Sequence, residues 1–275
     1  MREQGRPFAV AFLLSLTRAY TARLHRTSRS LVTFLDLRME TLITGWIAVI
    51  LLIGGAKVLT APMPINGVMQ GLSMLLPYLL VALAPIAGYR IAAGSFPRGQ
   101  LSAQPVIRLC RYGQWRALDE LSARRSPAFG PTGFMASLLL GLLLNVPVRS
   151  LEFFAAVPAM GGDAPLWAQK ILLAMTMDVI VMNFFYMVCF VLALRSVPLF
   201  PRMLLLAWVF DIVMQFIMAQ QIAGASHLPA QVATAMTAML TGNVKKVLIS
   251  AALWLPYLIL SERVNVTFRR RARTI

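Results

Sequence analysis

The feature that most limits how this chain can fold is a series of long apolar runs. In residues 171–194, Asp178 is the single charged residue. An apolar run of about 18 residues or more is long enough to cross the hydrocarbon core of a bilayer as a helix. Of the 275 residues, 59% are hydrophobic and 13% are charged, whereas soluble domains have about 25% charged residues. A chain of this length cannot bury so much apolar surface in one core, so we expect an all-α, polytopic helical membrane protein.

Six of these runs are expected to cross the membrane. They cover about residues 42–60, 68–92, 133–154, 167–194, 199–220 and 244–260. The segment 230–240 is apolar but too short, and too rich in Ala, Thr and Gln, to span by itself. The sequence therefore predicts a two-helix hairpin over residues 42–93 and a four-helix membrane domain over residues 132–268.

The second expected span contains two prolines and a stripe of small residues. Pro77 and Pro85 are expected to kink this helix, which membrane helices tolerate. Ala84, Gly88 and Ala92 follow one another at four-residue spacing and so share one helix face. Small side chains let helix backbones approach closely, so this face is predicted to be a tight helix–helix contact.

The distribution of basic residues predicts the orientation of the spans. The net charge is +16, which in a soluble protein would suggest binding to nucleic acid. Here 21 of the 26 Lys and Arg residues fall in residues 1–41, 89–132 and 195–202 and in the C-terminal tail after the sixth span. Basic residues accumulate on the cytoplasmic side of membrane proteins, so both termini are predicted to be cytoplasmic and no nucleic-acid partner is expected. The expected location is the bacterial inner membrane.

Three basic segments flank the expected spans. Residues 1–41 have apolar residues near helical spacing among arginines, which is typical of an amphipathic helix lying in the membrane interface. A signal peptide is the alternative for the start of this segment. Residues 94–131 form a basic cytoplasmic loop, in which Val106–Arg125 is predicted to be an amphipathic helix, either on the membrane surface or solvated. Residues 269–275 form a basic tail. We expect these segments to contact anionic lipid headgroups.

Two motifs at the ends of the four-helix domain have a recognisable pattern. The opening step is Gly133-Phe134, with Pro147 later in the same span, and Phe200-Pro201-Arg202 precedes the third of the four spans. The closing residues are Trp254, Pro256, Tyr257, Ser261, Arg263, Val264, Thr267 and Phe268. With these motifs, residues 128–268 resemble the bacterial membrane family called domain of unknown function 2569. The resemblance implies an inner-membrane protein with no known activity, and it leaves residues 1–127 unmatched.

The closing motif is interpreted as an interfacial anchor. Trp254 and Tyr257, on either side of Pro256, have side chains that favour the headgroup level of a bilayer. Ser261 and Arg263 follow, and Arg263 with the arginines after it is expected to bind lipid phosphates. Recognition of a partner or of a particular lipid headgroup is the alternative.

Five polar residues are expected inside the membrane, where polar and charged groups are costly and so mark tight pairing or function. They are Asn145, Arg149, Asp178, Asn183 and Asp211. At a rise of about 1.5 Å per residue, Arg149 and Asp178 lie at nearly equal depth on adjacent spans, which predicts an ion pair. Lys57 lies at a similar depth and is the alternative partner of Asp178. Asp211 is placed about 12 Å away from Asp178 along the membrane normal, which argues against a pair of aspartates sharing a proton.

The sequence contains no motif that identifies an enzyme. Metalloprotease, nucleophile-elbow and phosphate-loop patterns are missing from it, and neither cofactor nor metal ligands are expected. The first hypothesis is therefore a non-enzymatic scaffold or accessory subunit, with a membrane-protein partner or a second copy of itself. The second is a small-solute or ion transporter that uses the polar residues near mid-membrane. A polar cavity at that depth would favour transport, and a dry, Leu-packed interior would favour the scaffold.

Overall fold

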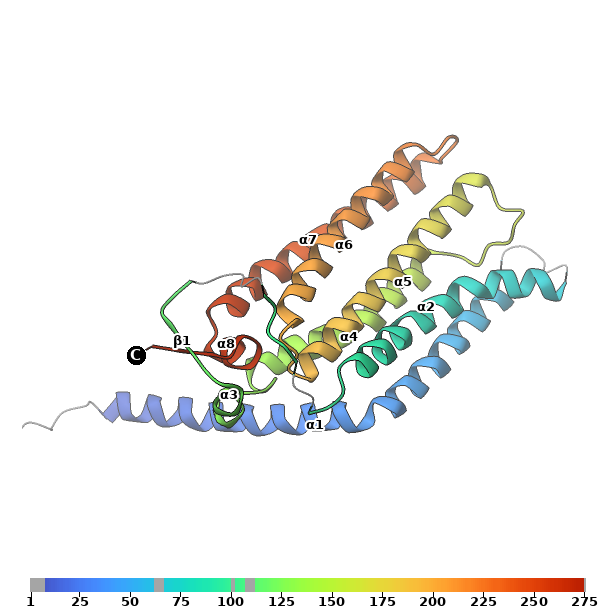
Figure 1. Cartoon of the computed structure of the whole chain (residues 1–275). Coiled ribbons are helices and arrows are strands. Elements are labelled where there is room, and N and C mark those ends of the chain that lie inside the picture. Colours follow the sequence, from blue (N-terminus) through green and yellow to red (C-terminus); the bar gives the residue numbers. More distant parts are fainter. Residues whose placement is uncertain (1–7, 62–66, 100–101, 107–111, 275) are drawn as a thin grey trace, which may run out of the picture.

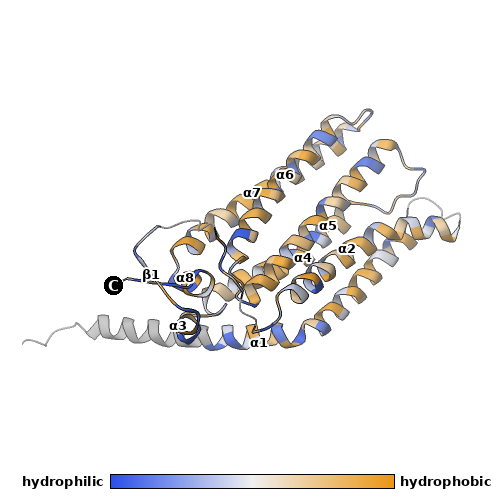
Figure 2. Ribbon diagram, viewed as in Figure 1, coloured by the Kyte–Doolittle hydropathy of each residue, from blue (hydrophilic) through white to orange (hydrophobic). Residues whose placement is uncertain are grey.

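The computed structural model describes residues 8–61, 67–99, 102–106 and 112–274, with side chains from residue 26 onward. Within that part, six helices are long and apolar enough to cross a membrane. They are α1 (Phe8–Leu59), α2 (Val68–Ser95), α4 (Phe134–Ala156), α5 (Leu166–Leu194), α6 (Phe200–Ala223) and α7 (Ala230–Leu260). The expectation of an all-α, polytopic helical protein is therefore confirmed, and Figure 2 shows that hydrophobic residues predominate along these helices.

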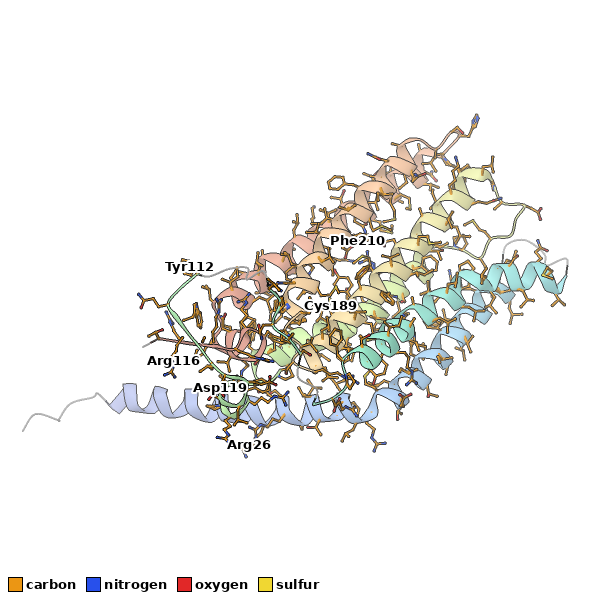
Figure 3. The ribbon with its side chains drawn as sticks, viewed as in Figure 1. Arg26, Tyr112, Arg116, Asp119, Cys189 and Phe210 are labelled. Atoms are coloured by element: carbon orange, nitrogen blue, oxygen red, sulfur yellow. The ribbon has the colours of Figure 1, made fainter. Side chains whose placement is uncertain are left out.

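The remaining described elements gather at one end of the bundle, which we call the basic end (Figure 1). They are β1 (Trp115–Ala117), α3 (Glu120–Arg125), α8 (Glu262–Arg269) and β2 (Arg271–Arg273). The two strands pair antiparallel, with Trp115 opposite Arg273. Figure 3 places Arg26, Arg116 and Asp119 at this end, and Cys189 and Phe210 within the bundle. The C-terminus also lies at the basic end.

One prediction about the basic segments is wrong. Val106–Arg125 is not one amphipathic helix, because strand β1 and the short helix α3 occupy its described part; residues 107–111 lie outside the described residues. Gly113 has a φ of +95°, a conformation that interrupts a right-handed helix and that glycine adopts readily. Within the predicted basic tail 269–275, Arg271–Arg273 form β2 and pair with β1.

Two expected helix boundaries are also absent. The expected boundary between the segment 1–41 and the first span is absent, because one helix, α1, runs unbroken from Phe8 to Leu59. No Gly or Pro occurs between residues 8 and 44, so nothing in the sequence interrupts the helix there. The segment 230–240 is not separate from the sixth span but forms the start of α7, which has 31 residues. At about 1.5 Å per residue, α7 is longer than a bilayer core is thick.

Helix α5 is the centre of the bundle. In its most apolar window 67% of the residues are buried, against 11% in the corresponding window of α7. The predicted small-residue face of α2 packs directly on α5: a Cβ added at Gly88 would lie 2.6 Å from the carbonyl oxygen of Phe184. Ala84 and Ala92 on the same face are buried too. The prediction that this stripe is a close helix contact is confirmed.

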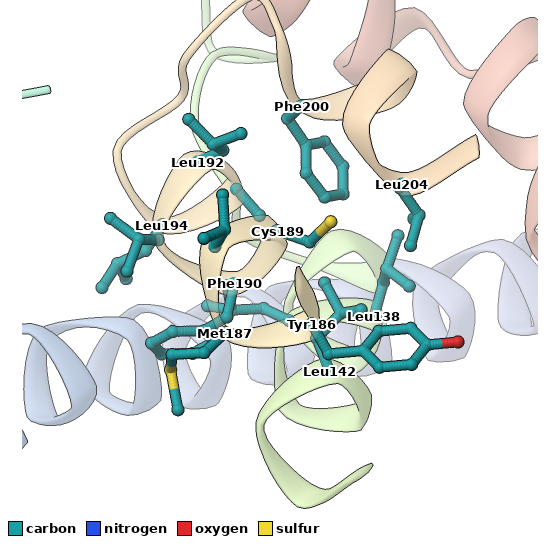
Figure 4. Close-up of a cluster of buried hydrophobic side chains, with 14 of the residues drawn as sticks. Leu138, Leu142, Tyr186, Met187, Cys189, Phe190, Leu192, Leu194, Phe200 and Leu204 are labelled. Atoms are coloured by element: carbon teal, nitrogen blue, oxygen red, sulfur yellow. The ribbon is translucent and has the colours of Figure 1, made fainter. Parts of the chain in front are cut away.

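The apolar interior has two parts. Towards the basic end, Cys189 and Phe190 of α5 pack with Phe200 of α6 and with Leu138 and Leu142 of α4 (Figure 4). Towards the opposite end, a second cluster contains Ile50, Tyr78, Phe153 and Val179. Along α4, Arg149 lies between these two clusters, and along α5, Asp178 lies between Met175 and Val179 of the second cluster.

Candidate functional site

A guanidinium bound by two carboxylates forms the centre of the candidate site. Arg149 of α4 donates from Nη1 to Asp211 Oδ2 at 2.8 Å and from Nη2 to Asp211 Oδ1 at 2.8 Å. Its Nη2 also donates to Asp178 Oδ2 at 2.9 Å and to Asp178 Oδ1 at 3.1 Å. The side chain of Arg149 is 12% exposed, that of Asp178 is 6% exposed and that of Asp211 is 1% exposed. We call these three residues the charge cluster. The ion pair predicted between Arg149 and Asp178 is present.

Neutral side chains add hydrogen bonds to the two carboxylates of the charge cluster. Tyr186 of α5 donates from its hydroxyl to Asp211 Oδ2 at 2.8 Å. Gln215 of α6 donates from Nε2 to Asp178 Oδ1 at 3.1 Å and to Asp211 Oδ1 at 3.3 Å. Asn243 of α7 in turn donates to Gln215 Oε1 at 3.2 Å. The network therefore joins α4, α5, α6 and α7, the four spans of residues 132–268.

The expected separation of Asp178 and Asp211 is wrong. Both carboxylates bind the same nitrogen of Arg149, so the depth argument against a proton-sharing pair does not hold. The depth estimated along the helix axes applies to backbone atoms. The long side chains of Arg149 and Gln215 span the difference in depth between Asp178 and Asp211. Gln215 lies one turn beyond Asp211 on α6 and reaches Asp178, while Tyr186 lies two turns from Asp178 on α5 and reaches Asp211.

A cavity of about 170 Å³ adjoins the charge cluster, between α4 and α7. Tyr186 of α5 and two residues of α6, Trp208 and Asp211, complete its lining. Its polar lining residues are Asn145, Arg149, Glu152, Tyr186, Asp211, Asn243, Lys246 and Ser250. The cavity is half open, and its volume has room for several water molecules. Glu152 and Lys246 pair across the space from α4 to α7.

The structure separates the two asparagines of the predicted polar set. Asn145 lines the cavity. Asn183 is fully buried and donates from Nδ2 to Ser150 Oγ at 2.9 Å, and it is not among the cavity-lining residues. Lys57, the alternative partner of Asp178, instead donates to the carbonyl oxygen of Val157 at 3.2 Å. Asn145 therefore belongs with the charge cluster, and Asn183 is a structural contact between α4 and α5.

Several residues of the site were missed in the sequence. Gln215 follows Asp211 by four residues, which places both on one helix face. Asn243, Lys246 and Ser250 recur at spacings of three and four, a polar stripe along α7. The sixth span as predicted begins at residue 244, so Asn243 falls outside it and the stripe does not show. Tyr186 carries no sequence signal that separates it from the apolar residues around it.

The opening and closing motifs of the four-helix domain meet at the basic end. The ring of Phe134, in the first turn of α4, lies 4.9 Å from that of Trp254 and 5.0 Å from that of Tyr257. Arg263 of α8 donates to Thr132 Oγ1 at 2.8 Å, next to Gly133. Residues more than 110 positions apart in the sequence thus form one contact, which closes the four-span unit on itself.

The arginines expected to bind lipid phosphates are engaged within the protein. Burial lowers the pKa of Arg263, whose guanidinium is held over the loop before α4. Arg269 donates to the carbonyl oxygen of Leu258 at 2.9 Å, and Arg270 pairs with Glu120 at 2.9 Å. Arg271 lies 5.0 Å from the ring of Trp115, a cation–π contact. These contacts fasten α8 and β2 to the basic end, and binding of lipid phosphates by these arginines stays a prediction.

Pro256 lies inside α7, and Ser261 ends that helix and precedes α8. Helix α8 is buried along five consecutive residues from Val264 to Phe268. Phe268 stacks on Phe200 at the start of α6, with 5.0 Å between ring centroids. The closing motif therefore acts as a packed cap on the bundle, in which most side chains face protein.

Comparison with protein-family models, curated proteins and solved structures found no match. The resemblance of residues 128–268 to domain of unknown function 2569 therefore stays a prediction. The function has to be argued from the charge cluster and its cavity.

Proposed function

We propose that this chain is a membrane transporter for a small polar solute, with the cavity between α4 and α7 as its binding site. The observation that carries this proposal is a half-open cavity beside the charge cluster, lined by eight polar residues as well as apolar ones. Charged and polar residues within spans are costly and mark solute or ion pathways when they line a cavity. A dry interior at this depth would have favoured a scaffold.

The composition of the cavity indicates the class of solute. Arg149 and Lys246 supply positive charge, and Glu152 and Asp211 supply negative charge, so the lining is balanced. Asn145, Asn243 and Ser250 add neutral groups that donate and accept hydrogen bonds. This lining suits a small neutral or zwitterionic solute. It does not favour a strongly charged one.

The arrangement of the helices supports a moving part. Helix α7 packs mainly on α6 and is the least buried of the six spans. The ion pair of Glu152 and Lys246 joins α7 to α4 across the cavity and is more than 40% exposed on both sides. Exposed ion pairs contribute little stability, so this contact is easily broken. Movement of α7 away from α4 would open the cavity.

Vesicle swelling tests the proposal. Reconstituted protein should speed the osmotic swelling of liposomes for at least one of three probes: glycerol, urea and glycine. Gly141→Leu should abolish the increase, because Gly141 lines the cavity and its Cβ position is open. Gly55→Leu is the matched control, since its Cβ position is also open but lies on α1, outside the cavity. Equal swelling of protein-containing and empty vesicles with all probes would contradict transport of such solutes.

A second candidate is the scaffold or accessory subunit, favoured by one apolar groove. A space of about 470 Å³ lies between α1, α2 and α4, lined mostly by apolar residues such as Trp46, Ile86 and Leu144. A helix of a membrane partner or of a second copy would fill it. Gly45→Leu would occupy this groove, because Gly45 lines it and has open space at its Cβ position. Loss of a co-purified protein from this variant in mild detergent would support the scaffold.

For location, we propose the bacterial inner membrane, with the basic end in the cytoplasm. The asymmetry of basic residues supports this orientation. Both ends of the described chain also lie towards the basic end, as an even number of spans requires (Figure 1). The meeting of Phe134 with Trp254 and Tyr257 supports the family resemblance, because it gives the opening and closing motifs a common structural role.

A further inference from the structure

The charge cluster has more acidic than basic groups. One guanidinium, that of Arg149, serves two carboxylates, those of Asp178 and Asp211. The other charged groups nearby are Glu152 of α4 and Lys246 of α7, which neutralise each other. Lys57 of α1 is occupied by a backbone carbonyl. With both aspartates ionised, the cluster would therefore hold one uncompensated negative charge.

An uncompensated charge is unfavourable in this place. Both aspartates are almost fully buried, and Met175 and Val179 of the second apolar cluster flank Asp178 along α5. Removing a carboxylate from water without a counter-charge is costly enough that the group takes up a proton instead. Two close carboxylates in a protein interior behave in the same way and share one proton.

We propose that Asp178 and Asp211 together hold one exchangeable proton over Arg149, which makes the charge cluster a proton-binding site. The cluster is then neutral: one guanidinium, one carboxylate and one carboxylic acid. The hydrogen bonds assign the charged partner. Asp211 forms the two-point fork with Nη1 and Nη2 and also accepts from Tyr186, so it keeps the carboxylate. Asp178 is bound through Nη2 alone, with Gln215 as its second donor, so it carries the proton.

The site has a route for exchange with water. Arg149, Tyr186 and Asp211 line the cavity, and Asp178 lies directly behind them on the same guanidinium. A proton leaving Asp178 gives Arg149 a second carboxylate to neutralise, which weakens its hold on Asp211. If the proposed transport function holds, this change links the protonation state to the wall of the solute cavity, and the proton is the coupling ion.

Infrared spectroscopy counts the protonated carboxyl groups directly. A carboxylic acid has a C=O stretch that a carboxylate lacks, and exposed Asp and Glu are ionised at neutral pH. The purified native protein at neutral pH should show a band for one protonated carboxyl, which shifts in D₂O. Asp178→Asn should abolish it. Asp211→Asn should abolish it too, because Arg149 then neutralises the single remaining carboxylate.

Two further variants complete the count. Arg149→Leu should raise the band to two carboxyls, since neither aspartate then has a counter-charge. Glu152→Gln should leave it at one, because Glu152 is paired outside the cluster. The proposal is overturned by a native protein without the band, or by a band that persists in both Asn variants. A band that appears only after sodium or potassium is removed would also overturn it, since a metal cation would then be the compensating charge. The swelling assay does not affect this count, so either proposal can fail without the other.

Discussion

The charge cluster makes Arg149 the residue whose loss should destabilise the bundle most within the four-span unit. Replacing it with leucine removes four hydrogen bonds and leaves two buried carboxyls with Tyr186 and Gln215 as their main donors. Breaking a buried ion pair by removing one partner costs about 3–5 kcal/mol. We expect Arg149→Leu to lower the free energy of unfolding by an amount in that range.

The same structure predicts how the loss can be reversed. Asp178→Asn should cost far less than Arg149→Leu, because the Arg149–Asp211 fork and the hydrogen bond from Gln215 do not need the charge of Asp178. Adding Asp178→Asn and Asp211→Asn to Arg149→Leu removes the orphaned carboxyls, so the triple variant should recover much of the stability. Denaturation of the purified proteins in mixed detergent micelles measures all three differences. A triple variant no more stable than Arg149→Leu would refute the reasoning.

Three other predictions address the frame around the site. Gly88→Ala should separate α2 from α5 and lower the melting temperature in detergent, whereas Gly55→Ala, with open space at its Cβ position, should not; equal melting temperatures would contradict the close contact. Arg263→Ala should loosen the basic end and speed proteolysis between residues 112 and 132, and unchanged cleavage would mean that its bond to Thr132 is dispensable. The hydrogen bond from the Ser122 N–H holds the pKa of Asp119 below its ordinary value. This cap of α3 is therefore complete above the ordinary pKa and is lost as the pH falls through the lowered one. Proteolysis after α3 should increase in acid for the native protein but not for Asp119→Asn, and an identical pH dependence of the two proteins would argue against the cap.

Local sequence patterns were sufficient to predict the membrane spans and the contact of α2 with another helix through Gly88. Uninterrupted apolar runs locate helices because a bilayer leaves the backbone no other way to satisfy its hydrogen bonds. The stripe through Gly88 was readable because small residues at four-residue spacing have one common physical use. The pair of Arg149 and Asp178 followed from equal depth on spans joined by a short loop. Each of these inferences depends on residues that are close in sequence or on helices that are consecutive.

The rest depends on contacts that no local pattern contains. Strand β1 exists because Arg271–Arg273 lies beside it, more than 150 residues away in the chain. Asp211 joins the charge cluster because side chains of Arg149 and Gln215 bridge helices whose backbones differ in depth. The polar stripe of α7 was hidden by a boundary drawn at Val244, which excluded Asn243 from the helix.

Thiol labelling at Ser250 tests most directly whether the bundle encloses water beside its charge cluster. In a background without Cys110 and Cys189, Ser250→Cys lines the cavity, and Ile249→Cys is 69% exposed on the adjacent, lipid-facing position of α7. A sulfonated, membrane-impermeant maleimide reacts only with a thiol that water reaches. If water reaches the cavity, the protein in lipid vesicles is labelled at Ser250→Cys and not at Ile249→Cys. Equal resistance of the two positions would mean a dry interior and would contradict the account.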